Sequence, residues 1–209
     1  MPRNSRTLKA MYVNQILGRF SSGLASPFIP YYAAELNFIP GEMGILQASS
    51  NLFPNVLQYP FGKLSDMIQK RIIFIIIGGI VSSLVFIFLI GQIDPLFIVL
   101  LIIVQAIFSA MVTPAWNALI GDVASTNKRA SFIGSLSFYS NLSMLFAGLF
   151  FLIYTMVKET KGVYVYYLPF GIAGVVGVLG TLVMLYAQEP EKKRVIKSKR
   201  SLLGIIKND

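Results

Sequence analysis

Six long apolar segments follow one another along the chain, with short polar stretches between them. They cover residues 8–34, 41–61, 72–92, 95–120, 131–156 and 164–187. Each is close to or above the roughly 20 residues that an α-helix needs to cross a bilayer. The segments lack the strict apolar and polar alternation that marks the strands of a membrane barrel. The pattern therefore predicts an all-α membrane protein with six transmembrane helices.

Composition agrees with this prediction. Of the 209 residues, 55% are hydrophobic and only 13% are charged. A soluble domain would have closer to a quarter of its residues charged. We therefore expect a chain whose main partner is the lipid bilayer.

The net charge of +9 could suggest nucleic-acid binding, but the distribution of the basic residues along the chain indicates membrane topology instead. Fifteen of the 18 basic residues fall before or at the very start of the first segment, in the second and fourth connections, or after the sixth segment. The opposite connections hold two, Lys158 and Lys161. Because cytoplasmic loops carry the excess of Lys and Arg, both termini are predicted in the cytoplasm of a multi-pass protein of the inner or plasma membrane. Nucleic-acid binding is not expected.

The chain has no cysteine and no histidine. This excludes disulfides, thiolate metal sites and histidine-based general catalysis. No segment contains a paired-aspartate motif of the kind an intramembrane enzyme would need. We expect no enzymatic activity, no cofactor and no metal.

The two halves of the sequence resemble each other. Residues 22–27 (SGLASP) and 109–114 (SAMVTP) match, and each is followed eight residues later by an acid. Residues 44–52 and 134–142 share the pattern G-x-L-x-x-x-S-N-L. Since three helices separate the copies, corresponding helices cross in opposite directions. The pattern predicts an inverted three-plus-three repeat, as secondary transporters use, with a substrate site near the bilayer midplane.

Polar side chains form helical stripes inside the first, second, fourth and fifth segments. Polar groups at membrane depth are costly, so they mark cavities or helix contacts. Holding helices together by hydrogen bonds is the alternative role for each amide and hydroxyl. The residues that we predict to face a substrate cavity are Gln15, Arg19, Ser22, Asn51, Asn55, Gln105, Ser109, Trp116, Asn117 and Asn141.

Arg19 lies near the middle of the first segment, where an isolated charge costs at least about 2.5 kcal/mol. No acid of this chain is predicted at a similar depth. Arg19 therefore faces water, an anionic substrate or a carboxylate outside this chain. A shifted helix that lets the guanidinium reach the inner headgroups is the alternative.

The polar connection after the second segment carries a recognisable motif. Gly62, Leu64, Asp66, Lys70 and Arg71 fit the pattern G-x-L-x-D-R-x-G-R-R. This connection resembles the one between helices two and three of the major facilitator superfamily. It departs from the family pattern at position 67, where Met replaces a base, and at position 69, where Gln replaces glycine.

The fourth connection resembles the one between helices four and five of the same family, in which an acid ends one helix and an arginine opens the next. Here these residues are Asp122 and Arg129. The resemblance implies the N-terminal half of a twelve-helix transporter, with a bundle over 1–189 and a basic cytoplasmic tail over 190–209 that begins a central linker. It implies that helices one and four line the cavity, two and five form the seam, and three and six face lipid. The gating motif that it implies consists of Gly62, Asp66, Arg71, Asp122 and Arg129.

In this reading Asp66 contacts the other half of the transporter, and Arg71 and Asp122 form an ion pair. We therefore expect transport of a small solute by alternating access, with a C-terminal six-helix half, in the same or a separate chain, as partner. Arg19 is the reason to favour an anionic substrate. The alternatives are an efflux-type exporter of the same fold and a six-helix membrane subunit without transport activity. Two features of drug exporters are missing, because Ile102 and Leu149 stand where those proteins carry arginine and proline.

Overall fold

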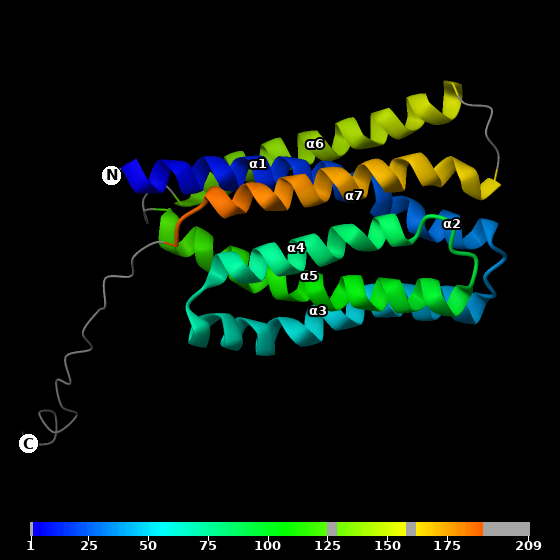
Figure 1. Cartoon of the computed structure of the whole chain (residues 1–209), viewed down its shortest axis with the longest axis horizontal. Coiled ribbons are helices and arrows are strands. Elements are labelled where there is room, and N and C mark those ends of the chain that lie inside the picture. The colour runs from blue at the N-terminus through cyan, green and yellow to red at the C-terminus, as the bar shows by residue number, and fades with distance from the viewer. Residues whose placement is uncertain (1, 125–128, 158–161, 190–209) are drawn as a thin grey trace, which may run out of the picture.

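The computed structural model describes residues 2–124, 129–157 and 162–189, and these form an elongated bundle of helices (Figure 1). The helices are α1 (Pro2–Ala25), α2 (Ile29–Glu35), α3 (Pro40–Ile68), α4 (Arg71–Phe88), α5 (Pro95–Val123), α6 (Arg129–Val157) and α7 (Tyr167–Leu182). Short 3-10 helices cover Ser26–Phe28, Gly162–Tyr166 and Val183–Tyr186. The expected all-α architecture is confirmed. The predicted tail, 190–209, lies outside the described residues.

Four helical stretches of the described chain are long and apolar enough to cross a membrane: residues 71–88, 95–123, 129–157 and 162–186. They correspond to the third to sixth predicted spans. The first two predicted spans are helical, but they are not among the helices that are apolar enough by mean hydropathy and charge. The basic residues of α1 and the Asn, Gln and Ser residues of α3 lower their mean hydropathy.

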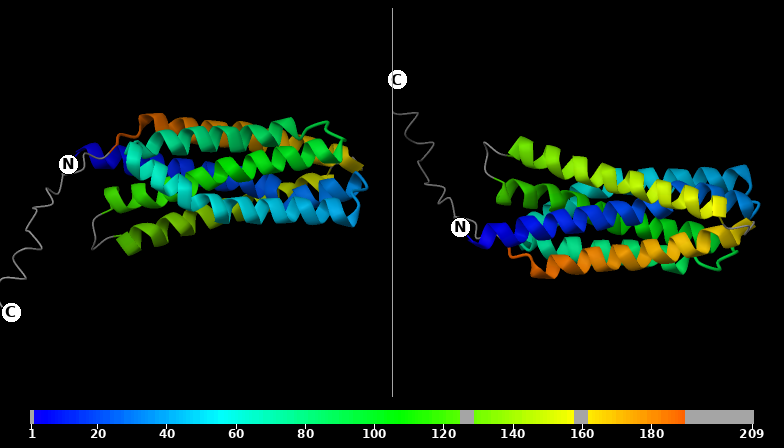
Figure 2. Two further views of the ribbon diagram at one scale, coloured as in Figure 1. Left: turned by 90° about the horizontal axis from the view of Figure 1, so that it is seen from below. Right: turned by 90° about the horizontal axis from the view of Figure 1, so that it is seen from above.

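The first predicted span is interrupted rather than continuous. The helix α1 ends at Ala25, a 3-10 turn follows, and α2 resumes in nearly the same direction (Figure 2). Pro27 and Pro30 lie at this interruption. Proline lacks the backbone N–H that a helix interior needs, so the regular hydrogen bonding is broken there.

The short polar connection expected over 62–71 is mostly helical. The helix α3 continues to Ile68, and only Gln69 and Lys70 separate it from α4. Gln69 ends α3 with a positive φ of 59°, and its N–H donates to the carbonyl oxygen of Ser65. This is the left-handed cap position that glycine usually occupies. The family's glycine at this point thus has a conformational reason, which Gln69 meets at some cost.

Helices from the two halves of the chain are packed against each other (Figure 1). The helix α1 packs on α6 and α7, α5 packs on α3 and α4, and α4 packs on α7. The helices α3 and α6 therefore lie at opposite edges of the bundle. Two apolar clusters fill its ends, one around Tyr32, Leu89 and Phe170 and the other around Met11, Leu119 and Met184.

Glycines allow α4 to approach its neighbours closely. A Cβ added at Gly79 would lie 2.6 Å from the hydroxyl of Thr181, and one at Gly177 would lie 2.4 Å from the hydroxyl of Ser83. These two glycines therefore allow α4 and α7 to pack closely where the hydroxyls of Thr181 and Ser83 lie.

Candidate functional site

A cavity of about 540 Å³ lies between the two apolar clusters. Its lining comes from α1, α2, α3, α4, α5 and α7 and from the turn after α1. More than half of the lining residues carry polar side chains. Its volume is within the range of about 300–1,000 Å³ that ligand sites occupy.

Half of the predicted cavity residues line this cavity. They are Gln15, Arg19, Ser22, Gln105 and Ser109. They come from α1 and α5, the helices that correspond to the first and fourth predicted spans. Each helix places its polar residues on one side because positions three and four residues apart share a face.

The other five predicted residues do not line this cavity. Asn51, Asn55, Asn117 and Asn141 are exposed on α3, α5 and α6. The amides of Asn51 and Asn55 donate to carbonyl oxygens of their own helix, each over 2.9 Å. Trp116 packs beside the apolar cluster around Met11.

The sequence analysis missed polar lining residues on α4 and α7. Ser82, Ser83 and Thr181 line the cavity, although the family resemblance placed these helices against lipid. Asn14 of α1 also lines the cavity, and its amide donates to the carbonyl oxygen of Gly180 over 3.0 Å. The neighbouring glycines, which allow close approach, are the signal in the sequence that could have found the α4 and α7 hydroxyls.

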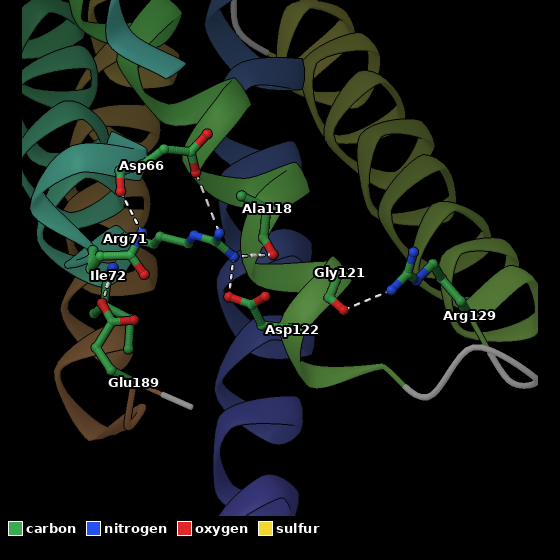
Figure 3. Close-up of polar contacts among 9 residues, drawn as sticks. Asp66, Arg71, Ile72, Ala118, Gly121, Asp122, Arg129 and Glu189 are labelled. Carbon is green, nitrogen blue, oxygen red and sulfur yellow. Dashed lines mark hydrogen bonds and ion pairs between the residues drawn. The ribbon is translucent and has the colours of Figure 1, made fainter. Parts of the chain in front are cut away.

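A group of ionic contacts lies at the end of the bundle where α3 meets α4 (Figure 3). The guanidinium of Arg71 donates to the carboxylate of Asp122 and to the carbonyl oxygen of Ala118. It lies 3.4 Å from the carboxylate of Asp66. The Arg71 side chain is 8% exposed, against 24% for Asp122 and 65% for Asp66. The predicted ion pair between Arg71 and Asp122 is therefore present.

The two remaining residues of the predicted gating motif lie nearby on α3 and α6. The guanidinium of Arg129 donates to the carbonyl oxygen of Gly121 over 2.7 Å, joining the start of α6 to the end of α5 (Figure 3). A Cβ added at Gly62 would lie 3.4 Å from the Cβ of Pro114, so α3 and α5 are in contact there.

One further acidic residue, which the sequence analysis did not select, joins this region. Glu189, just after the last helical turn, accepts a hydrogen bond of 2.6 Å from the backbone N–H of Ile72 in the first turn of α4 (Figure 3). The preceding residue, Gln188, exchanges hydrogen bonds with Thr7 of α1. The end of the described chain is thereby held against the beginnings of α1 and α4.

No group of three or more metal-ligating side chains occurs in the part of the chain that the structure describes. Among the described lining residues, the cavity offers hydrogen bonding by amides and hydroxyls, together with one guanidinium, that of Arg19.

Comparison with known proteins gives the family. The model of the Major Facilitator Superfamily matches residues 11–209. The chain belongs to this superfamily. The resemblance seen in the second and fourth connections is therefore confirmed, and the protein is a multi-pass membrane protein.

A solved structure has a similar fold. It is a bacterial homolog of the human lysosomal transporter Spinster, in an inward-facing and unoccupied conformation. The two are 18% identical with a TM-score of 0.68, and the match covers 96% of this chain and 47% of that one. The present chain thus spans about half the length of that transporter. No match was found among curated proteins.

Proposed function

We propose that this chain forms the N-terminal half of a secondary transporter and moves a small solute by alternating access. The observation that carries the proposal is the central cavity, which superfamily membership associates with solute binding. Arg19, the one charged residue among the described residues that line the cavity, favours an anionic substrate over a cation.

We also propose that the chain crosses the membrane six times. The helix α3 has 29 residues, which corresponds to about 43 Å, and α1 continues through a short turn into α2. Both are long enough to cross a bilayer of about 30 Å. The bases Lys63, Arg71 and Arg129 belong to the end of α3 and the starts of α4 and α6, which lie at the end of the bundle where the chain begins (Figure 1). This supports a cytoplasmic location for that end. We place the protein in the plasma membrane.

The inverted repeat is supported by the way the helices pack. If α1, α3 and α4 correspond to α5, α6 and α7, each main contact has a counterpart. The contact of α1 with α6 matches that of α5 with α3, and the contact of α1 with α7 matches that of α5 with α4. The contact of α4 with α7 is its own counterpart. This exchange of helices between repeats adds to the argument from the matching sequence patterns.

A second six-helix half is the proposed partner, in the same or a separate chain. The polar residues Asn51, Asn55 and Asn141 are exposed on the two edge helices, α3 and α6, and exposed amides are costly against lipid. A second half packed on these helices would give them polar or aqueous surroundings. The exposed carboxylate of Asp66 would contact the same partner and close the cytoplasmic side.

Counterflow in proteoliposomes tests this proposal. The chain is reconstituted together with the second half, and vesicles are loaded with a mixture of candidate solutes. Alternating access predicts saturable uptake of a labelled solute that is accelerated when the same solute is inside. Uptake that rises linearly with concentration, without acceleration, would indicate a pore. Absence of flux for every solute would favour the six-helix subunit without transport activity.

A further inference from the structure

The described lining of the cavity carries one positive charge and no negative charge. Among the described residues that line it, Arg19 is the only cation and none carries a carboxylate. No hydrogen bond or ion pair of the Arg19 guanidinium is present within the described chain, and the residue is exposed to the cavity. One guanidinium can pair with one carboxylate through two parallel hydrogen bonds. The cavity therefore offers compensation for a single negative charge.

Most of the hydroxyl groups in the lining already donate a hydrogen bond to a backbone carbonyl oxygen. Those of Ser22, Ser50 and Ser109 donate to carbonyl oxygens of their own helices over 3.0–3.2 Å. Those of Ser83 and Thr181 do the same over 2.7 and 2.9 Å. A serine or threonine hydroxyl has one proton but two lone pairs. In this arrangement each of these oxygens faces a ligand only as an acceptor.

Amides supply both kinds of hydrogen-bonding group. The side chains of Gln15, Gln47 and Gln105 line the cavity, and within the described residues none has a hydrogen-bonding partner. Each can donate through nitrogen and accept through oxygen. Away from Arg19, the lining thus contains more acceptors than donors. It suits a ligand with several O–H groups and disfavours a second carboxylate or a phosphate dianion, which would present further acceptors.

We propose that the cavity binds a small hydroxylated monoanion, with its carboxylate on Arg19 and its hydroxyl groups donating to the serine, threonine and glutamine oxygens. This names a substrate class for the proposed transport function and depends on that function for its biological meaning. Binding itself does not require that transport occurs, so the two can be tested separately.

Four six-carbon probes separate the contribution of the ligand's charge to binding from that of its hydroxyl groups. Gluconate has both the carboxylate and the hydroxyls, sorbitol has the hydroxyls without the charge, and hexanoate has the charge without the hydroxyls. Glucamine replaces the negative charge by a positive one. Affinities are measured from the rise in thermal unfolding temperature of the purified chain in lipid nanodiscs, together with any second half that co-purifies. We expect gluconate to bind most tightly and glucamine least tightly.

Two arginine variants of α1 give a matched comparison. Arg19→Gln should weaken gluconate binding on the order of 10- to 100-fold, the usual contribution of hydrogen bonds to a charged group, and should leave sorbitol binding nearly unchanged. Arg6→Gln removes the same charge from an exposed residue of the same helix outside the cavity lining, and should alter neither. Ser109→Ala should weaken gluconate and sorbitol by similar factors and leave hexanoate unchanged.

Several results would overturn the inference. They are equal affinity for gluconate and sorbitol, equal affinity for gluconate and hexanoate, preference for glucamine, or no binding of gluconate at about 10 mM, tenfold above the weak end of ordinary KM values. Flux of sorbitol or glucamine in preference to gluconate would overturn the substrate class while leaving transport intact. Tight gluconate binding with no flux of any solute would instead contradict the proposed function.

Discussion

Arg71 of α4 and Asp122 of α5 form an ion pair in which the guanidinium is almost completely buried. The same guanidinium also donates to the carbonyl oxygen of Ala118 and lies 3.4 Å from Asp66. Arg71 thus joins the end of α3, the start of α4 and the end of α5 (Figure 3). Since Asp122 is the less exposed of the two acids, it contributes most of the compensation for the buried charge.

Asp122→Asn should destabilise the protein. Breaking a buried ion pair costs about 3–5 kcal/mol because it leaves a charge without compensation. The 24% exposure of Asp122 and the remaining Asp66 carboxylate reduce this to about 1–3 kcal/mol. The free energy of unfolding in detergent measures the loss, and Lys70→Gln, which removes an exposed base beside Arg71, is the control. Arg71→Gln combined with Asp122→Asn should cost clearly less than the sum of the single changes, and strict additivity would contradict the coupling.

Asp66→Asn should reduce transport strongly and change the stability of the protein little. Asp66 is 65% exposed and its contact with Arg71 is long, so the stability change should stay below about 1 kcal/mol. If Asp66 closes the cytoplasmic side against the second half, transport should fall strongly while the amount of protein in the membrane stays near that of the wild type. Transport and expression are measured on the same cells. A parallel fall of both would show that Asp66 acts in folding, and the gating role would have to be abandoned.

The helices of the bundle could be predicted because each apolar block is about as long as a bilayer is thick. The residues at which the helices end could not be predicted, because local capping interactions determine them. The helix α3 runs beyond the apolar block to Ile68, since residues 62–68 include no proline, and Gln69 accepts the left-handed conformation that ends it. The first span was predicted as one piece although Pro27 and Pro30 break its hydrogen bonding.

The site was predictable only where polar residues recur along one helix. Gln15, Arg19 and Ser22 are spaced for one face of α1 and all line the cavity. Ser83 and Thr181 sit on helices that are otherwise almost wholly apolar, so no periodicity marks them. Their place at the cavity follows from how α4 and α7 pack on each other, which depends on residues far apart in the sequence.

Glu189→Ala should loosen the start of α4. Glu189 accepts from the N–H of Ile72, and α4 has no cap from the side chain of its own preceding residue. Loss of a helix cap costs about 0.5–2 kcal/mol. We expect faster hydrogen exchange at the Ile72 amide and a lower unfolding temperature, with a smaller effect from Glu189→Gln, which keeps an acceptor oxygen.

Glu42→Ala is the matched comparison for this cap. Glu42 accepts from the N–H of Ile39 over 3.0 Å, within the same first turn of α3. Its loss should raise exchange at Ile39 and leave Ile72 unaffected. If Glu189→Ala leaves the exchange rate of the Ile72 amide at its wild-type value, Glu189 does not cap α4 in the membrane.

Single cysteines can test the proposed orientation because the chain has none of its own. Lys63→Cys and Lys70→Cys lie at the end predicted to be cytoplasmic, and Gly41→Cys and Ile93→Cys lie at the other, all at exposed positions. A membrane-impermeant maleimide applied to intact cells should label positions 41 and 93 at once, and positions 63 and 70 only after permeabilisation. Labelling at 63 or 70 in intact cells would reverse the assignment.

Gly78→Ala should disrupt the contact between α4 and α5. A Cβ at this position would lie 2.5 Å from the Val112 side chain and 2.6 Å from the backbone oxygen of Phe108, which cannot rotate away. Overpacking of this kind costs about 1–3 kcal/mol. Gly148→Ala is the control, because a Cβ there meets nothing within 4 Å and alanine favours a helix by up to about 1 kcal/mol.

Adding Val112→Ala to Gly78→Ala distinguishes the contact with the Val112 side chain from the contact with the backbone oxygen of Phe108. It removes the side-chain clash but leaves the backbone oxygen of Phe108 in place, so only part of the lost stability should return. The unfolding temperature of the single and double variants measures this recovery, with Val112→Ala alone as the reference for the cost of the cavity it creates. Complete recovery would mean that the two backbones can separate without cost. Close approach of α4 and α5 at Gly78 would then not be what holds these helices together.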